Sequence, residues 1–283
     1  MTDQKTHPYL PKLAAELEKG RIDRREFLRT ATLLGLSAGA AYKFAGLADP
    51  APAFAQAAKA PSGRVRIGMR VHEIKDPYTI SWVEPSNLIR QTSEFLTRTG
   101  HDNVTRPRIL EKWEASEDLK TWTLRIRPGV KFRDGKAFVA DHLIWNVKRA
   151  LDPATGSSIL GLMKSYMLTE YETDEVDKDG KKKKTTKLWD SRAIEKVDDM
   201  TVRLNLKEAA LAVPEHFFHY PFFMLDPNEN GTYKEGTNGL GAFELVTYQV
   251  GSRAVLRARK DYWGGGPLLE TVEFIDLGSE PAA

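Results

Sequence analysis

Segments in which apolar and charged residues alternate constrain the fold of this chain more than any other feature. In Thr121–Gly135, TWTLRIRPGVKFRDG, every second residue of the first six is apolar, and Pro-Gly and Asp-Gly pairs then favour turns. Arg64–Val71 alternates in the same way, and so does Ala254–Ala258, which follows a Gly-Ser pair that favours a hairpin turn. A period of two residues is typical of a half-buried strand. We therefore expect sheets with one face turned to a core.

Segments with helical spacing lie between these strands. Leu88 and Thr92, followed by Phe95 or Leu96, stand three or four residues apart, which predicts a helix with one packed face. Asp141 is a good N-cap for a second helix that runs to the Asp-Pro pair at 152–153. Because strands and helices are mixed along the chain, the fold class is α/β or α+β.

The segment 23–41, DRREFLRTATLLGLSAGAA, admits three interpretations. Its apolar run is too short and too rich in glycine for a membrane-spanning helix, which needs about 18 apolar residues. Acidic residues break up its basic character, so a nucleic-acid surface is disfavoured. A charged leader, a short apolar run and small residues at 50–61 together predict a signal peptide. Ala53–Ala55 and Ala55–Ala57 are both acceptable cleavage triplets, so we expect residues 1–57 to be removed.

The hexapeptide RREFLR resembles the twin-arginine export motif, Arg-Arg-x-Phe-Leu-Lys/Arg, through Arg24, Arg25, Phe27 and Leu28. This resemblance implies recognition by the twin-arginine translocase, which carries proteins that are already folded. The chain has no cysteine, so a lipid anchor on an N-terminal cysteine is excluded. We expect an unanchored periplasmic protein.

Composition and motifs exclude several other classes of function. The net charge of +3 is mild and its basic residues are interspersed with acids, so nucleic acid is not expected as a partner. We find no catalytic or phosphate-binding motif. His216 and His219 would share a face of a helix and could hold a metal, but no third ligand lies near them in the sequence, and packed histidines are favoured. The charge run Asp174–Lys187 predicts a solvated hairpin tip or a disordered loop.

Two long segments, 107–153 and 236–277, together resemble the extracytoplasmic solute-binding proteins of family 5, which serve ABC importers of peptides, nickel and related solutes. The first, which begins PRILEKW, resembles the family through Trp113 of the family's proline-led Leu-Ala-x-x-Trp, a strand, a turn-rich RPGVKF-x-DG and a helix opened by Ala-Asp; the second resembles it through a glycine turn, a hairpin and YWGG-x-P. The matching residues are Trp113, Arg127, Pro128, Gly129, Val130, Lys131, Phe132, Asp134, Gly135, Ala140, Asp141, Tyr262, Trp263, Gly264, Gly265 and Pro267. Arg133, where the family usually has histidine, departs from the pattern.

The resemblance implies an α/β, periplasmic-binding-protein-like (type II) fold of two lobes, of which residues 58–283 form mainly the first. Because family members usually have about five hundred residues or more, we expect the sequence to be an N-terminal fragment that stops near the crossover to the second lobe. The intact protein would be the periplasmic component of an ABC importer, a monomer without cofactor that delivers a peptide or other small solute to permease subunits. Ser81, Trp82, Val83 and Ile159 would line its ligand cleft. The alternatives are a non-binding fragment of such a protein and a metal-binding protein or enzyme built on His216 and His219.

Overall fold

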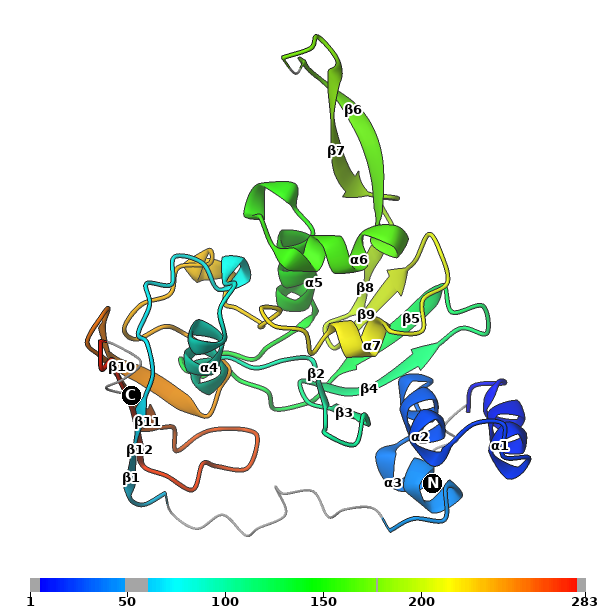
Figure 1. Cartoon of the computed structure of the whole chain (residues 1–283), viewed down its shortest axis with the longest axis horizontal. Coiled ribbons are helices and arrows are strands. Elements are labelled where there is room, and N and C mark those ends of the chain that lie inside the picture. Colours follow the sequence, from blue (N-terminus) through cyan, green and yellow to red (C-terminus); the bar gives the residue numbers. More distant parts are fainter. Residues whose placement is uncertain (1–5, 49–60, 177, 279–283) are drawn as a thin grey trace.

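Two four-stranded sheets organise the part of the chain that the structure, a computed structural model, describes: residues 6–48, 61–176 and 178–278 (Figure 1). The first sheet has the order β1-β12-β11-β10, and the second has the order β4-β5-β9-β8. The strands of the first sheet are β1 (Arg64–Gly68), β10 (Phe243–Gln249), β11 (Arg253–Ala258) and β12 (Thr271–Ile275). The strands of the second are β4 (Leu110–Ala115), β5 (Thr121–Ile126), β8 (Ile194–Asp198) and β9 (Thr201–Asn205).

The described part of residues 61–278 is called the lobe below. The first sheet joins its two ends. β1 pairs in parallel with β12, with Arg64 opposite Thr271, and β12, β11 and β10 are antiparallel neighbours. The predicted hairpin is confirmed as β10 and β11. β1 is an edge strand, and the basic residues that alternate along it contact Glu273 of β12, where Arg66 Nε donates to Oε2 at 3.1 Å.

The second sheet carries the densest part of the core. Trp122, Leu124 and Ile126 of β5 are all fully buried, as their alternation predicts. Helix α5 (Ala140–Ala150) packs against β8 and β9, and it buries Leu143 and Val147, one turn apart. The largest fully buried side chains are aromatic, and they include Phe132, Phe138, Phe217, Phe222 and Phe223.

The predicted N-cap of α5 is wrong by two residues. Asp141 does not cap α5; Val139 is the N-cap residue, and its N–H donates to His142 Nδ1 at 3.0 Å. Asp141 lies instead in the first turn, where it accepts a hydrogen bond from Lys196 at 2.7 Å. The earlier helix, α4 (Val83–Thr92), begins after Trp82 and ends at Thr92.

Shorter elements complete the lobe. They are the antiparallel pair β2 (Thr97–Thr99) and β3 (Thr105–Pro107), the helices α6 (Ser158–Met167) and α7 (Val213–His216), and the single-turn 3-10 helices η1 (Pro77–Thr79), η2 (Pro153–Thr155) and η3 (Pro227–Glu229).

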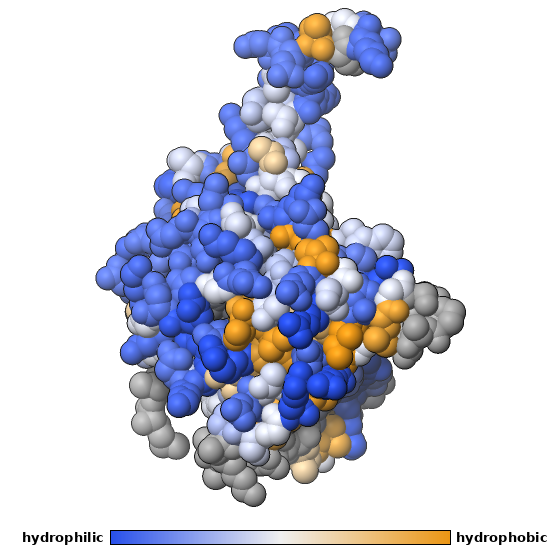
Figure 2. Space-filling view, turned by 90° about the vertical axis from the view of Figure 1, so that its left-hand side faces the viewer, coloured by the Kyte–Doolittle hydropathy of each residue, from blue (hydrophilic) through white to orange (hydrophobic). Residues whose placement is uncertain are grey.

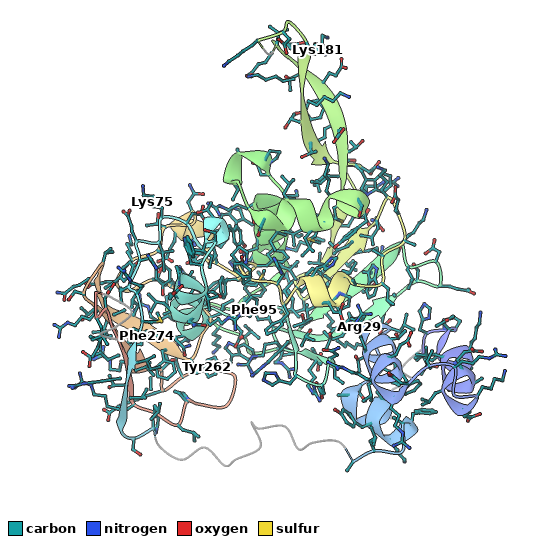
Figure 3. The ribbon with its side chains drawn as sticks, in the orientation of Figure 1. Arg29, Lys75, Phe95, Lys181, Tyr262 and Phe274 are labelled. Carbon is teal, nitrogen blue, oxygen red and sulfur yellow. The ribbon has the colours of Figure 1, made fainter. Side chains whose placement is uncertain are left out.

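The charge run forms a hairpin that projects from the lobe (Figure 1). It consists of β6 (Leu168–Val176) and β7 (Lys182–Leu188), which pair only with each other among the described strands. Most of its side chains are exposed, and Lys181 marks its tip in Figure 3. The interpretation as a solvated hairpin is thus confirmed.

The N-terminal segment also folds. Helices α1 (Leu10–Glu18), α2 (Arg24–Leu33) and α3 (Ala38–Phe44) pack on one another, and α2 packs against β3 and α7 of the lobe. The sequence interpretation assigned no structure to residues 1–57, so this packing was not foreseen. The two candidate cleavage triplets lie outside the described residues, and cleavage stays a prediction.

Candidate functional site

A surface cavity of about 380 Å³ lies beside the N-terminus of α4, beneath the loop that follows β1. Two of the residues that the family resemblance places at a ligand, Ser81 and Trp82, line it. The complete lining is His72, Glu73, Ile74, Lys75, Asp76, Thr79, Ile80, Ser81, Trp82 and Pro85. This loop lies on the side of the molecule that faces the viewer in Figure 2, where apolar surface gathers among hydrophilic residues.

The loop is held at one end by Tyr248 of β10. Its hydroxyl accepts a hydrogen bond from the N–H of Ile74 at 2.9 Å and donates to the carbonyl of His72 at 2.5 Å. Burial raises the pKa of Tyr248 to about 12, so the hydroxyl keeps the proton that it donates. The cavity floor is therefore fixed to the first sheet.

Asp76 and Tyr78 hold the loop in the middle. Asp76 accepts a hydrogen bond from the N–H of Tyr78 at 2.9 Å and forms an ion pair with Arg149 of α5. The Arg149 guanidinium also lies 5.2 Å from the centre of the Tyr78 ring. Tyr78 is fully buried, and its hydroxyl donates to the carbonyl of Phe223 at 3.0 Å and contacts Asn146. These contacts hold the loop rigidly, and a binding site needs such rigidity.

Trp82 and Val83 project from this anchored loop. Their exposed fractions are 64% and 70%, whereas Pro85, two residues after Val83, is buried. An indole exposed to this degree at the rim of a cavity offers a flat apolar surface for stacking, with an N–H donor at its edge. A side chain this exposed does not anchor the loop in the core, so the exposure of Trp82 favours a role at the cleft wall.

Ile159 lies elsewhere. It is fully buried in the main core at the start of α6, where its N–H is bonded by the Ser157 side chain, and it does not line the cavity. Val83 adjoins Trp82 but is also absent from the lining. Contact of either residue with a ligand stays a prediction. A larger hollow of about 450 Å³ on the β4–β5–β9 face contains none of the predicted residues.

The histidine pair forms packed, hydrogen-bonded rings. His216 Nδ1 lies 2.6 Å from the Tyr166 hydroxyl, and the two rings stack with an interplanar angle of 14°. Burial lowers the pKa of both His216 and His219, which favours their neutral forms. Among residues 6–48, 61–176 and 178–278, no group of three or more His, Asp or Glu side chains could hold a metal.

The two motif-bearing segments meet in space. Arg133 donates to the carbonyl of Gly236 at 2.6 Å, and the N–H of Asp134 donates to Asn238 at 2.9 Å. Arg259, only 5% exposed, donates to the carbonyls of Phe132 and Gly239, both at 3.1 Å. Arg133 thus joins the two turns by a hydrogen bond. The buried Arg259 also joins them, and this role was not predicted from the sequence.

The glycine turn that Arg133 contacts packs against the end of α4. A Cβ on Gly239 would lie 1.8 Å from the carbonyl oxygen of Thr92, and one on Gly241 would lie 2.4 Å from that of Gln91. Only Gly236 in this turn has a positive φ, at +70°. Positive φ therefore accounts for the glycine at position 236, whereas Gly239 and Gly241 permit close backbone contact.

A family model described as bacterial extracellular solute-binding proteins, family 5 Middle, matches residues 105–283, which is more than half of the chain. The chain belongs to this family. The family resemblance inferred from the two segments is thereby confirmed. Members of family 5 are solute-binding proteins and not enzymes, as the sequence led us to expect.

Among curated proteins, this family 5 chain is similar to the periplasmic oligopeptide-binding protein OppA of Haemophilus influenzae, with 25% identity over 66% of this chain and 34% of the relative. It is also 28% identical to the dipeptide-binding protein DppE of Bacillus subtilis, over 65% of this chain and 32% of the relative. The chain thus spans about a third of the length of these relatives.

Solved structures share the fold of this family 5 chain. The murein tripeptide binding protein MppA of Escherichia coli superposes with a TM-score of 0.60 and 18% identity, over 77% of this chain and 43% of that one. MoaA of A. tumefaciens R10, in complex with mannopinic acid, gives a TM-score of 0.63 and 20% identity, over 78% and 42%. The expected α/β fold class is confirmed. Within the described residues, no helix combines the length and apolar character that crossing a bilayer requires.

Proposed function

We propose that this chain supplies one wall of the ligand cleft of a periplasmic, peptide-binding component of an ABC importer. The observation that carries the proposal is the exposure of Trp82, 64%, on a loop anchored by Tyr78 and Tyr248 beside a cavity of about 380 Å³. The oligopeptide- and dipeptide-binding relatives support peptides as the solute class.

The chemistry of the cavity suits an extended peptide. Glu73, Lys75 and Asp76 place charges of both signs at its edge, where they can meet the ammonium and carboxylate ends of a short peptide. Trp82 supplies a surface on which an apolar or aromatic side chain can stack. Peptide backbone bonds to loop carbonyls and N–H groups would give affinity without strict sequence preference. In family 5 a second lobe closes over the ligand, and the permease subunits recognise the closed form.

The same proposal covers the organisation of the chain. Residues 1–57 are an export signal read by the twin-arginine translocase, and residues 58–283 are the first lobe. Arg24 and Arg25 support this assignment because both are exposed at the N-terminus of α2.

Peptide-dependent thermal stabilisation tests the binding proposal. Because a ligand that binds only the folded state raises the unfolding midpoint, a di- to pentapeptide panel at millimolar concentration should shift it for the purified chain. Trp82→Ala should abolish the shift and leave the midpoint without peptide nearly unchanged, since the side chain is exposed. Val197→Ala, which trims an exposed side chain on β8, is the matched control and should keep the full shift.

Two results would count against the proposal. No shift with any peptide would identify the chain as a non-binding fragment. A shift that survives Trp82→Ala would place the peptide somewhere other than this cavity.

A further inference from the structure

The twin-arginine-like motif is part of a folded helix. Asp23 caps α2 by accepting a hydrogen bond from the N–H of Glu26 at 2.7 Å. Arg24 and Arg25 are exposed, but Phe27 and Leu28 are only 1% and 4% exposed. Phe27 packs near Phe44 of α3, and Phe27 and Leu28 belong to the buried apolar cluster of the three-helix unit. Half of the motif is thus turned inward.

The last residue of the motif binds the lobe directly. Arg29 donates through Nε and Nη2 to the two carboxylate oxygens of Glu215 on α7, both at 2.6 Å. Figure 3 labels Arg29 where α2 and α7 adjoin. A bidentate arginine–carboxylate pair fixes the relative orientation of the two side chains as well as their distance. The ion pair therefore sets how α2 lies on the lobe.

Further hydrogen bonds and an apolar contact join the unit to the lobe. Trp113 of β4 donates through Nε1 to the carbonyl of Leu33 at 2.9 Å, in a buried position. Tyr42 of α3 donates to Asp102 at 2.6 Å. Val104, which precedes β3 and is fully buried, belongs to the same apolar cluster as the three helices. A helix that merely rested on the surface would not engage a buried indole N–H.

The backbone at the end of α2 approaches the lobe as closely as a glycine permits. Gly35 has φ of +91°, and a Cβ there would lie 2.7 Å from the carbonyl oxygen of Trp113. Gly46, in the same unit, has a similar φ of +66° but nothing within 4 Å of an added Cβ. Any side chain at Gly35 would therefore have to displace the unit from β4, whereas one at Gly46 would only strain its own backbone.

We infer that residues 6–48 form a docked cover in the uncleaved chain, in which Phe27, Leu28 and Arg29 are engaged while Arg24, Arg25 and Glu26 remain exposed. The docked state and a translocase-bound state of α2 then exclude each other, so docking lowers the fraction of molecules competent for export. The export part of this inference rests on the proposed twin-arginine route; the docking part does not.

Hydrogen exchange on the purified, uncleaved chain tests docking without any translocase. We expect the amides of Phe27–Leu33 to exchange at least about tenfold more slowly than in a free peptide of the same sequence. Gly35→Ala should remove most of this protection, while Gly46→Ala should stay within about twofold of the parent. Unchanged protection of β5 in both variants would show that the lobe itself is folded. An unprotected α2 in the parent, or equal exchange in the two glycine variants, would overturn docking.

Export kinetics test whether docking of α2 hides the export motif from the translocase. Glu215→Gln breaks the ion pair and leaves the leader sequence untouched, so pulse-chase processing of the precursor should accelerate by about two- to fivefold. Glu208→Gln, which lies outside the interface contacts, should leave the rate unchanged. A rate unaltered by Glu215→Gln, together with increased exchange of α2, would overturn masking. Export that persists without the arginine pair would instead refute the twin-arginine route and leave the exchange result standing.

Discussion

Arg108 donates through Nε to Glu94 at 2.7 Å, and this ion pair is largely buried, with side chains only 15% and 14% exposed. The guanidinium also lies 5.1 Å from the centre of the Trp263 ring, and Tyr262 donates to the same carboxylate at 2.8 Å. The cluster thus connects the segment after α4, the start of β4 and the Tyr-Trp-Gly-Gly segment. It holds the two sheets of the lobe together from the inside.

Arg108→Gln should destabilise the lobe by about 3 kcal/mol, because it leaves the Glu94 carboxylate buried without its cation. Urea unfolding followed by tryptophan fluorescence measures the change. Lys112→Gln, which breaks an exposed pair with Glu114, is the control and should change stability by less than about 1 kcal/mol. Equal effects of the two substitutions would mean that burial adds nothing to the Arg108 pair.

The neutral histidines predict a loss of stability in mild acid. Burial lowers the pKa of His216 in the folded state, so below the unfolded value of about 6.5 the unfolded chain binds more protons. The free energy of unfolding should therefore stay flat above pH 6.5 and fall as the pH decreases from 6.5 to 5. A slope of up to about 1.4 kcal/mol per pH unit is the limit for one such group.

His216→Gln should reduce this dependence by the share that His216 contributes, because glutamine cannot take up the proton, while His219 keeps its own share. His101→Gln, at an exposed position, is the control and should keep the parent slope. Denaturant titrations at half-unit intervals of pH measure both. A parent protein that is equally stable at pH 5 and 6.5 would contradict the prediction.

The hairpin β6–β7 should be dispensable for folding. Replacing residues 170–186 with a short glycine-containing turn removes mainly exposed side chains, so the unfolding free energy should change by less than about 1 kcal/mol. Leu124→Ala, a truncation in the fully buried core, should cost about 2–5 kcal/mol in the same assay. A hairpin deletion that unfolds the chain would show that β6 and β7 support α6.

Replacement of both Arg24 and Arg25 by lysine should retain the precursor in the cytoplasm if the twin-arginine route carries it. Fractionation and immunoblotting of cells that express the chain measure the periplasmic share. Arg21→Lys removes a nearby exposed arginine that pairs with Glu16, and this variant should be exported normally. Normal export of the double variant would exclude this route.

Patterns of period two predicted the parts of the fold that depend on local burial. Trp122, Leu124 and Ile126 are all fully buried, and the hairpin around Gly251 forms as expected. Such positions are predictable because the strand pleat alone decides which side chains face the core.

Features that depend on distant partners were not predictable in this way. The full burial of Ile159 depends on how α6 packs, and local spacing did not indicate it. Arg259 looks like one more charge on an exposed strand end, but carbonyls more than a hundred residues away complete its hydrogen bonds. The leader was set aside because its pattern matches an export signal, and that pattern carries no information about Glu215 or Trp113.

The parallel pairing of β1 with β12 imposes an order on synthesis. Arg66 and Glu273 are 207 residues apart in the sequence, so β1 leaves the ribosome long before its partner exists. At 5–20 residues per second the strand waits roughly 10–40 s with its backbone unpaired. Closure of the first sheet therefore waits until every other described strand of this chain has been made.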